Sequence, residues 1–237
     1  MIRGFAVVLL FVVLSSFESF AQLNKGLIFS IDFKKNQGKR PFDITRLNNC
    51  VMTGTSNSYQ FGYYSFLTAN SDLIDCGNNS SINVTTALTI SFWVNLVSGS
   101  TTGVTKVTTA TTGFSYRALL NPDNRVYWQF SSNGTTVSHF QSPFYPTNTW
   151  VMITCVYNGN GTGNAGRSQV YFNAVNQTAN SFLGTIPSSL FQSPTNMQIN
   201  YVNLAYGTGK FKSIMIWDRA LSATEVRQLY INRYNNK

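Results

Sequence analysis

Acidic side chains are the first residues to consider, because glycoside hydrolysis generally needs two carboxylates, one as acid and one as base or nucleophile. Beyond residue 21 the sequence contains a single glutamate, Glu225, and its most closely spaced acids are Asp72 and Asp75. Residues three apart on an extended strand face opposite sides, so these two carboxylates would not converge. The sequence therefore predicts a protein that is not an enzyme, with an Asp-based glycoside hydrolase as an alternative.

Nucleophilic catalysis through a Ser-His-Asp arrangement would have to use the only histidine, His139, in the segment TVSHFQS. A serine nucleophile of the α/β-hydrolase type sits in a G-x-S-x-G turn, and the sequence contains no such motif. A lone histidine in a strand is more often structural or exposed. We therefore do not predict His139 to be catalytic.

Calcium is the inorganic partner that the sequence favours most. Ca²⁺ takes about six to eight oxygen ligands, which aspartate, asparagine and backbone carbonyls can supply. No D-x-D-x-D-G loop is present, so calcium is a candidate cofactor without a defined loop. The candidate ligands are Asp32, Asp43, Asp72, Asp75 and Asp218.

Carbohydrate binding would need a surface with outward aromatic rings beside amide or cationic donors. Arg117, Tyr127 and Gln129 are candidates, because they fall on non-core positions of two neighbouring strand patterns. Tyr206, in the turn AYGTGK, is a further candidate. An ordinary sandwich surface would carry similar residues, so the pattern alone leaves both interpretations open.

Strand patterns position these residues. Apolar, β-branched and aromatic residues alternate with polar ones, and the breaks are rich in Asn and Gly, which is typical of a β-sandwich or jelly roll. Trp93, Trp150 and Trp217 lie within or beside these strand patterns and are predicted to be core. The segments are 27–33, 87–97, 114–120, 125–131, 150–157, 169–172, 197–204 and 211–217.

One helix is predicted close to the end of the chain. Ser222 fits the N-cap, and Glu225 three residues later completes a capping box. Val226, Leu229 and Tyr230 share one face. A helix of about three turns is marginal in water, so we expect this face to pack against the sandwich.

Charge and cysteine content exclude some classes of protein. The net charge is +9, but only 11% of residues are charged and the basic ones are scattered. Nucleic-acid binding is not predicted, because no basic stripe or known motif is present. A positive field favours acidic polysaccharides or an anionic cell surface instead. Of the three cysteines, Cys50 and Cys76 could pair or remain free, while Cys155 lies in an apolar strand and is predicted to be buried.

The first residues have the pattern of a secretory signal peptide, residues 1–21. Arg3 precedes the ten-residue apolar run FAVVLLFVVL, and Ala21 ends a small-residue cleavage pattern. A run of that length is too short for a transmembrane helix, which needs about 20 residues. We therefore expect an exported protein, secreted or at the cell surface, with one domain over 22–237.

Several segments resemble the laminin G-like domains of the concanavalin A-like lectin/glucanase superfamily in order and spacing. They are SFLTANSDLIDCGNNSSI (65–82), TISFWVNL (89–96), TWVMITCVYNG (149–159), QVYFNA (169–174) and FKSIMIWDRALSATEVRQLY (211–230). The resemblance implies an all-β fold: a two-sheet antiparallel jelly-roll sandwich with one short C-terminal helix, in which the last strand lies near the first.

The sequence departs from this family at two points. The usual Y-V-N-G turn ends in Ala174 instead of glycine. The closely spaced acids of the hydrolytic members, such as E-x-D-x-x-E, are absent. The resemblance therefore favours an exported, non-catalytic module that binds a glycan or a surface protein. A self-associating building block of an extracellular appendage, matrix or virion coat is the alternative.

Overall fold

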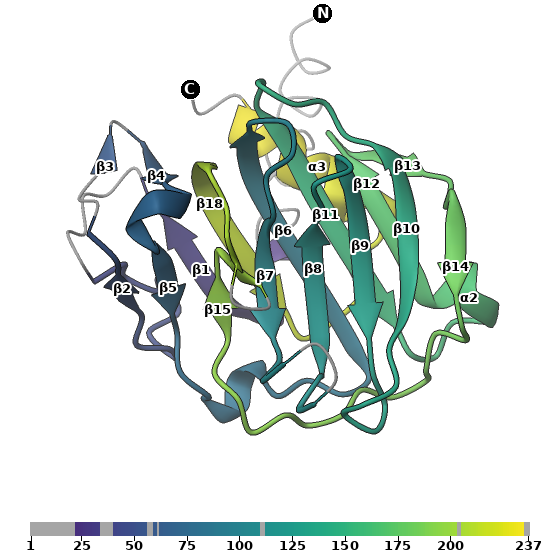
Figure 1. The fold of residues 1–237 in the computed structure, drawn as a ribbon. Coiled ribbons are helices and arrows are strands. Elements are labelled where there is room, and N and C mark those ends of the chain that lie inside the picture. Colours follow the sequence, from purple (N-terminus) through teal and green to yellow (C-terminus); the bar gives the residue numbers. More distant parts are fainter. Residues whose placement is uncertain are drawn as a thin grey trace, which may run out of the picture.

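The computed structural model describes residues 22–33, 40–55, 59–60, 62–109, 112–202 and 205–234. The predicted signal peptide, 1–21, lies outside these residues. Two eight-stranded sheets pack face to face, as Figure 1 shows. Every strand pair within them is antiparallel. The predicted all-β, two-sheet fold is confirmed.

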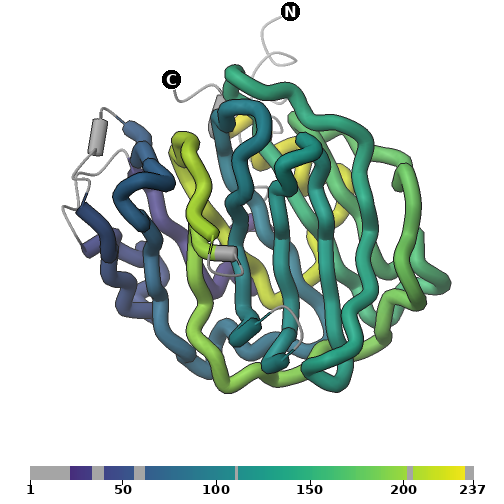
Figure 2. Tube along the Cα trace, viewed as in Figure 1, coloured from purple at the N-terminus to yellow at the C-terminus, as the bar shows by residue number. Residues whose placement is uncertain are grey.

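The back sheet has the order β13-β12-β11-β6-β18-β4-β3, with β1 also paired to β18. The last strand therefore lies beside the first, as the resemblance implied; Figure 2 shows the purple and yellow-green segments adjacent. The strands are β1 Leu27–Asp32, β3 Tyr59–Gln60, β4 Tyr63–Phe66, β6 Ala87–Leu96, β11 Val151–Asn158, β12 Ser168–Phe172, β13 Val175–Gln177 and β18 Gly209–Trp217.

The front sheet faces the viewer in Figure 1 and has the order β14-β10-β9-β8-β7-β15-β5-β2. Its strands are β2 Val51–Thr53, β5 Leu73–Asp75, β7 Thr102–Lys106, β8 Tyr116–Leu120, β9 Arg125–Phe130, β10 Ser138–Phe144, β14 Ser181–Leu183 and β15 Gln198–Ile199. Smaller elements are the hairpin of β16 Tyr201–Val202 and β17 Ala205–Tyr206, η1 Thr68–Asn70, η2 Ser80–Ile82 and α2 Gly163–Arg167.

The main core lies between the sheets and follows the alternation of the strands. Alternate residues of the predicted strand 87–97, namely Leu88, Ile90, Phe92 and Val94 of β6, are almost completely buried there. Trp128 of β9 is fully buried from the opposite sheet, and its indole N–H donates to the carbonyl of Val156 at 3.1 Å. Non-local apolar contact therefore fixes the two sheets against each other.

Helix α3, Ala223–Tyr234, covers part of the outer side of the back sheet. Val226 and Leu229 are buried against Trp93 and Trp217, in a second apolar cluster. Tyr230 is only partly buried, with its ring stacked on Trp93 at 5.6 Å between centroids. The helix docks as predicted. Within the described residues, no helix has both the length and the apolar composition to cross a bilayer.

The tryptophan prediction holds for Trp93 and Trp217 but is wrong for Trp150, which is only partly buried. Trp150 directly precedes β11 and packs against the apolar cluster under α3 without being fully buried by it. Alternation with core residues therefore did not predict how exposed Trp150 is.

The predicted capping box is present at the start of α3. The Ser222 N–H donates to Glu225 Oε2 at 2.8 Å, and the Glu225 N–H donates back to Ser222 Oγ at 3.3 Å. Arg219 adds an ion pair to Glu225 Oε1 at 2.7 Å. Burial alone would raise the pKa of the Glu225 carboxyl, but the Ser222 N–H and the Arg219 guanidinium hold it below its usual value.

We expect Glu225→Gln to lower the free energy of unfolding by about 1 kcal/mol at pH 7, because it weakens this cap. The folded pKa lies below the ordinary 4.5, so the stabilisation is complete above that value and is lost as the pH falls through the folded pKa. Urea unfolding of both proteins between pH 7 and pH 3 should show a difference that shrinks only below about pH 4.5. A difference that grew in acid would contradict this account.

The turn between β12 and β13 shows what the missing glycine costs. Asn173 and Ala174 have φ angles of 49° and 65°, the left-handed pair of a two-residue hairpin turn. An alanine in this region is strained by about 1–2 kcal/mol, whereas glycine is not.

We therefore expect Ala174→Gly to raise the free energy of unfolding by about 0.5–1 kcal/mol, after the greater freedom of glycine in the unfolded chain is subtracted. Ala223→Gly is the matched control, because Ala223 is not among the residues with positive φ. That control should be neutral or destabilising in the same thermal melts. A destabilised Ala174→Gly protein would refute the strain argument.

The cysteines resolve the alternatives that the sequence left open. Cys50 and Cys76 form a disulfide, which links the start of β2 to the end of β5. Cys155 is free and fully buried in the main core, as predicted, and burial raises the pKa of its thiol. Cys155 is therefore a packing residue.

Candidate functional site

The outer side of strands β8, β9 and β10 carries polar and aromatic side chains that lie close together. Arg117 pairs in register with Gln129, which pairs with His139, while Tyr127 pairs with Gln141. Because side chains alternate along a strand, all five residues lie on the side away from the main core. We call these five residues the front face.

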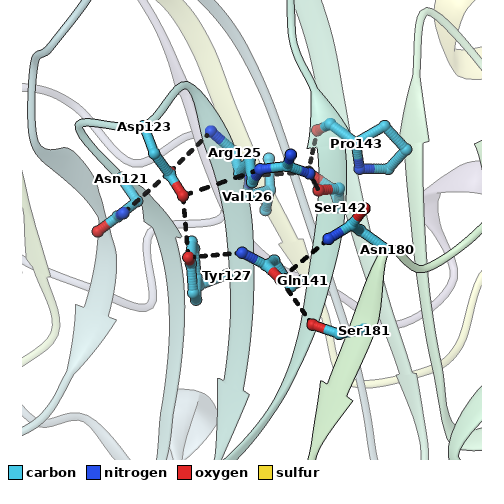
Figure 3. Close-up of polar contacts among 10 residues, drawn as sticks. All are labelled: Asn121, Asp123, Arg125, Val126, Tyr127, Gln141, Ser142, Pro143, Asn180 and Ser181. Carbon is cyan, nitrogen blue, oxygen red and sulfur yellow. Dashed lines mark hydrogen bonds and ion pairs between the residues drawn. The ribbon is translucent and has the colours of Figure 1, made fainter.

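A chain of hydrogen bonds crosses three strands of this sheet (Figure 3). The Tyr127 hydroxyl donates to Asp123 Oδ2 at 2.9 Å and accepts from Gln141 Nε2 at 2.7 Å. Gln141 Oε1 in turn accepts from the Ser181 hydroxyl at 2.6 Å. Burial and the Asp123 carboxylate raise the pKa of Tyr127. The Tyr127 ring is thus held in place through its hydroxyl, and the side chain stays partly exposed.

A cationic side chain, that of Arg125, lies at the edge of the front face. The Arg125 guanidinium donates to the Ser142 carbonyl at 2.9 Å and lies 3.9 Å from the centre of the Phe144 ring. It also pairs with Asp123 at 3.9 Å. Phe144 is 64% exposed, so this edge presents an aromatic ring with a cation above it.

Two of the predicted ligand-binding residues are not available at the surface. Arg117 and Gln129 are only 5% and 8% exposed, and Arg117 Nε donates to Gln129 Oε1 at 2.6 Å. The guanidinium lies 5.0 Å from the ring centre of Phe114, a fully buried residue just before β8. Burial lowers the pKa of Arg117 to about 10, so it stays charged at pH 7. The prediction that both present donors to a ligand needs correction: they pair with each other and are covered within the front face.

Gln141 and His139 are the two front-face residues that the sequence did not predict, and His139 lies against Tyr127. Its ring lies 5.0 Å from that of Tyr127, at 59°, and its Nδ1 is buried without a hydrogen-bond partner among the described residues. Burial, and secondarily the charge of Arg117, lower its pKa, so the imidazole is neutral at pH 7. The alternation of His139 and Gln141 in SHFQS matches that of Tyr127 and Gln129, and this signal could have revealed it.

Comparison with known proteins identifies the fold. A laminin G-type profile, described as the concanavalin A-like lectin/glucanases superfamily, matches residues 68–227. The chain belongs to the concanavalin A-like lectin/glucanases superfamily. A search of curated proteins by sequence gives no match.

Solved structures show the same superfamily fold in bacterial toxins. The binding domain of botulinum neurotoxin serotype G superposes with a TM-score of 0.64 at 16% identity, covering 87% of this chain and 51% of that chain. A type C neurotoxin structure, whose title states that cell entry depends on two ganglioside molecules, gives 0.66 at 16% identity, covering 90% and 52%. The serotype D ligand-binding domain with N-acetylneuraminic acid gives 0.62 at 14%, covering 91% and 53%. The chain thus spans about half the length of these structures, and the likeness shows a shared fold.

Tyr206 is positioned by a different element of this superfamily fold. It lies in β17, and its ring is 5.3 Å from that of Tyr201 on β16. Their hairpin is anchored to β7, where Thr105 Oγ1 donates to the Tyr201 carbonyl at 3.2 Å. Tyr206 therefore pairs with Tyr201, and Tyr127 with His139, as two separate aromatic pairs.

The five candidate calcium ligands are dispersed in the structure. Asp43 accepts five hydrogen bonds, Asp75 accepts from Gly77, Asn196 and Gln198, and Asp218 is exposed after β18. Within the described ranges, no three Asp, Glu, His or Cys side chains form a group that could hold a metal. The five predicted ligands therefore do not converge on one site in the described ranges.

Asp72 and Asp75, the candidate acids for a glycoside hydrolase, also form hydrogen bonds to different partners. Asp72 is fully buried just before β5 and accepts from the Leu67 N–H at 3.0 Å, whereas Asp75 ends that strand and binds Asn196 and Gln198. The remaining candidate, Asp32, ends β1 opposite Ser213. Asp72 and Asp75 are thus engaged in holding loops, as structural acids are.

Proposed function

We propose that the protein is an exported, non-catalytic binding module whose front face recognises a glycan at a cell surface or in an extracellular matrix. The observation that carries the proposal is the pair of Tyr127 and His139 rings, flanked by the amide of Gln141. The signal-peptide pattern of residues 1–21 supports export.

The chemistry of this pair suits a sugar. An aromatic ring offers a rigid apolar surface with a polar end, which matches a pyranose with C–H groups on its face and hydroxyls at its rim. The neutral His139 imidazole can accept or donate one hydrogen bond, and an amide side chain can do both.

The proteins of similar structure support a binding role by analogy only. Titles of the related structures name gangliosides, N-acetylneuraminic acid and, for one, rat synaptotagmin II as ligands of those proteins. Both glycans and proteins are therefore recognised on this fold. The front face favours the glycan because its central contacts are rings, amides and an imidazole instead of a broad apolar patch.

A glycan array followed by titration tests the proposal. We expect Tyr127→Ala to weaken binding of any glycan hit by about tenfold or more, equal to about 1.4 kcal/mol, and His139→Ala to weaken it as well. Tyr206→Ala is the matched control, because it removes the same side chain from the separate hairpin. Thermal melts must first show that the variants are folded.

The results separate the alternatives. If no glycan on the array bound and a protein partner were captured, the ligand would be a protein instead of a glycan. An effect of Tyr206→Ala but not of Tyr127→Ala would move the site to the hairpin. A large, concentration-independent assembly in light scattering, with neither ligand, would favour the structural building block.

A further inference from the structure

A second aromatic surface lies on the opposite side of the sandwich, on the outer side of the back sheet. Helix α3 and its apolar cluster cover the part of this side around Trp93, Met215 and Trp217. Towards β4 and the first half of β18, side chains on the same side remain at least partly exposed: Tyr63, Trp150, Lys210 and Lys212. We call these four residues the aromatic–lysine patch.

The four side chains form a continuous row. Lys210 Nζ lies 5.2 Å from the ring centre of Tyr63, and Lys212 Nζ lies 4.4 Å from that of Trp150. The two rings are themselves 5.8 Å apart. The row therefore runs cation, ring, ring, cation, with two aromatic surfaces adjacent and positive charge at both ends.

Strand geometry explains why the row forms. Lys210 pairs in register with Ser65 on β4, and period-two alternation places Tyr63, Ser65, Lys210 and Lys212 on one side of the sheet. Phe211, between the lysines, points inward and is fully buried. Each lysine is thus held over a ring at a distance that gives a favourable cation–π contact.

Exposure and charge indicate a ligand. Trp150 is partly exposed, whereas the other three tryptophans of the chain are at most 8% exposed. Lys210 is exposed, and no ion pair of it is found within the described residues. Lys212 is only partly exposed, so Lys210 is the end of the row that is more open to a negatively charged group.

We propose that the aromatic–lysine patch binds an acidic saccharide. The sugar ring would lie against Trp150 and Tyr63, and its carboxylate or sulfate would form a charge-assisted hydrogen bond with Lys210. Two cations are too few for the backbone-tracking channel that single-stranded nucleic acids need. This site is distinct from the front face and does not depend on it.

Tryptophan fluorescence of the purified protein tests the proposal at low salt. The probes are a uronate-containing oligosaccharide and the same oligosaccharide with its carboxyls reduced to alcohols. We expect the acidic probe to change the emission, the neutral one to bind at least fivefold more weakly, and the affinity to fall in 0.5 M salt, where screening is strong. Trp150→Phe should retain binding by calorimetry but lose most of the fluorescence change.

Matched charge variants complete the test. Lys210→Ala should weaken acidic-probe binding at least fivefold, while Arg227→Ala, which removes one positive charge from an exposed position on α3, should change it less than twofold. Equal losses in both variants would show diffuse attraction and overturn the proposal, as would equal binding of the neutral probe. If an oligonucleotide bound more tightly through the same residues, the ligand of the patch would be a nucleic acid instead of a saccharide.

The proposals for the front face and for the aromatic–lysine patch can be tested separately. Tyr127→Ala should leave binding of the acidic probe unchanged, because Tyr127 lies on the other sheet. If Tyr127→Ala abolished it and Lys210→Ala did not, the acidic saccharide would belong to the front face, and the aromatic–lysine patch would carry no site.

Discussion

Asp43→Asn is expected to lower the free energy of unfolding by about 3–5 kcal/mol, although the two side chains have nearly the same shape. Asp43 Oδ1 accepts from the N–H groups of Ser30 and Thr45 at 2.9 and 3.0 Å. Oδ2 accepts from Thr45 Oγ1 at 2.7 Å, and from the Asn48 N–H and Nδ2 at 3.1 and 2.9 Å. The carboxylate thus ties the segment after residue 40 to β1.

An asparagine can keep only one of the two acceptor positions. If its NH₂ group takes the Oδ2 position, it faces two donors of Asn48, and if the amide is flipped, it faces those of Ser30 and Thr45. Either orientation leaves buried N–H groups unpaired, which costs about 1–3 kcal/mol each.

Urea unfolding measures this effect. Asp218→Asn is the control, because Asp218 is exposed and such a change normally stays within about 0.5 kcal/mol. An Asp43→Asn protein with the same unfolding midpoint as the control would show that Asp43 does not organise this segment.

Removing the disulfide is expected to have an effect of similar size. Cys50 and Cys76 are 26 residues apart in sequence, and closing a loop of that length restricts the unfolded chain by about 3–4 kcal/mol in the chain-entropy description. The double variant Cys50→Ala/Cys76→Ala should therefore unfold at clearly lower urea concentration than the parent. The strands β2 and β5, which the disulfide joins at the end of the front sheet, should be the first to lose protection in hydrogen exchange.

Reductant supplies the control for this experiment. It should lower the unfolding midpoint of the parent to that of the double variant and leave the double variant unchanged. A parent protein that is insensitive to reductant after complete unfolding and refolding would show that the disulfide is absent.

Local pattern was sufficient for most of the secondary structure. Alternation in 87–97 predicted which side of β6 faces the main core, since a strand with period two places alternate side chains on one side. The Ser222–Glu225 capping box was predicted for the same kind of reason, because both partners lie within one turn of a helix.

The candidate site was predicted only in part. The sequence indicated Tyr127 but placed Arg117 and Gln129 beside it as exposed donors, and it left His139 aside. Period two gives the side of a sheet on which a residue lies, but it does not show what else covers that side. Phe114 lies against Arg117 from outside the strand, which strand alternation cannot show.

The sequence by itself determined the all-β class, the docked helix and the shortage of acids that argues against hydrolysis, because these depend on composition and on contacts between near neighbours. Only the tertiary structure decided which aromatic and cationic residues meet. Tyr127 on β9 meets His139 on β10, and Trp150 packs against the α3 cluster but stays partly exposed beside Lys212. Such contacts join residues on different strands, and their geometry follows from strand register and from the packing of the helix on the sheet.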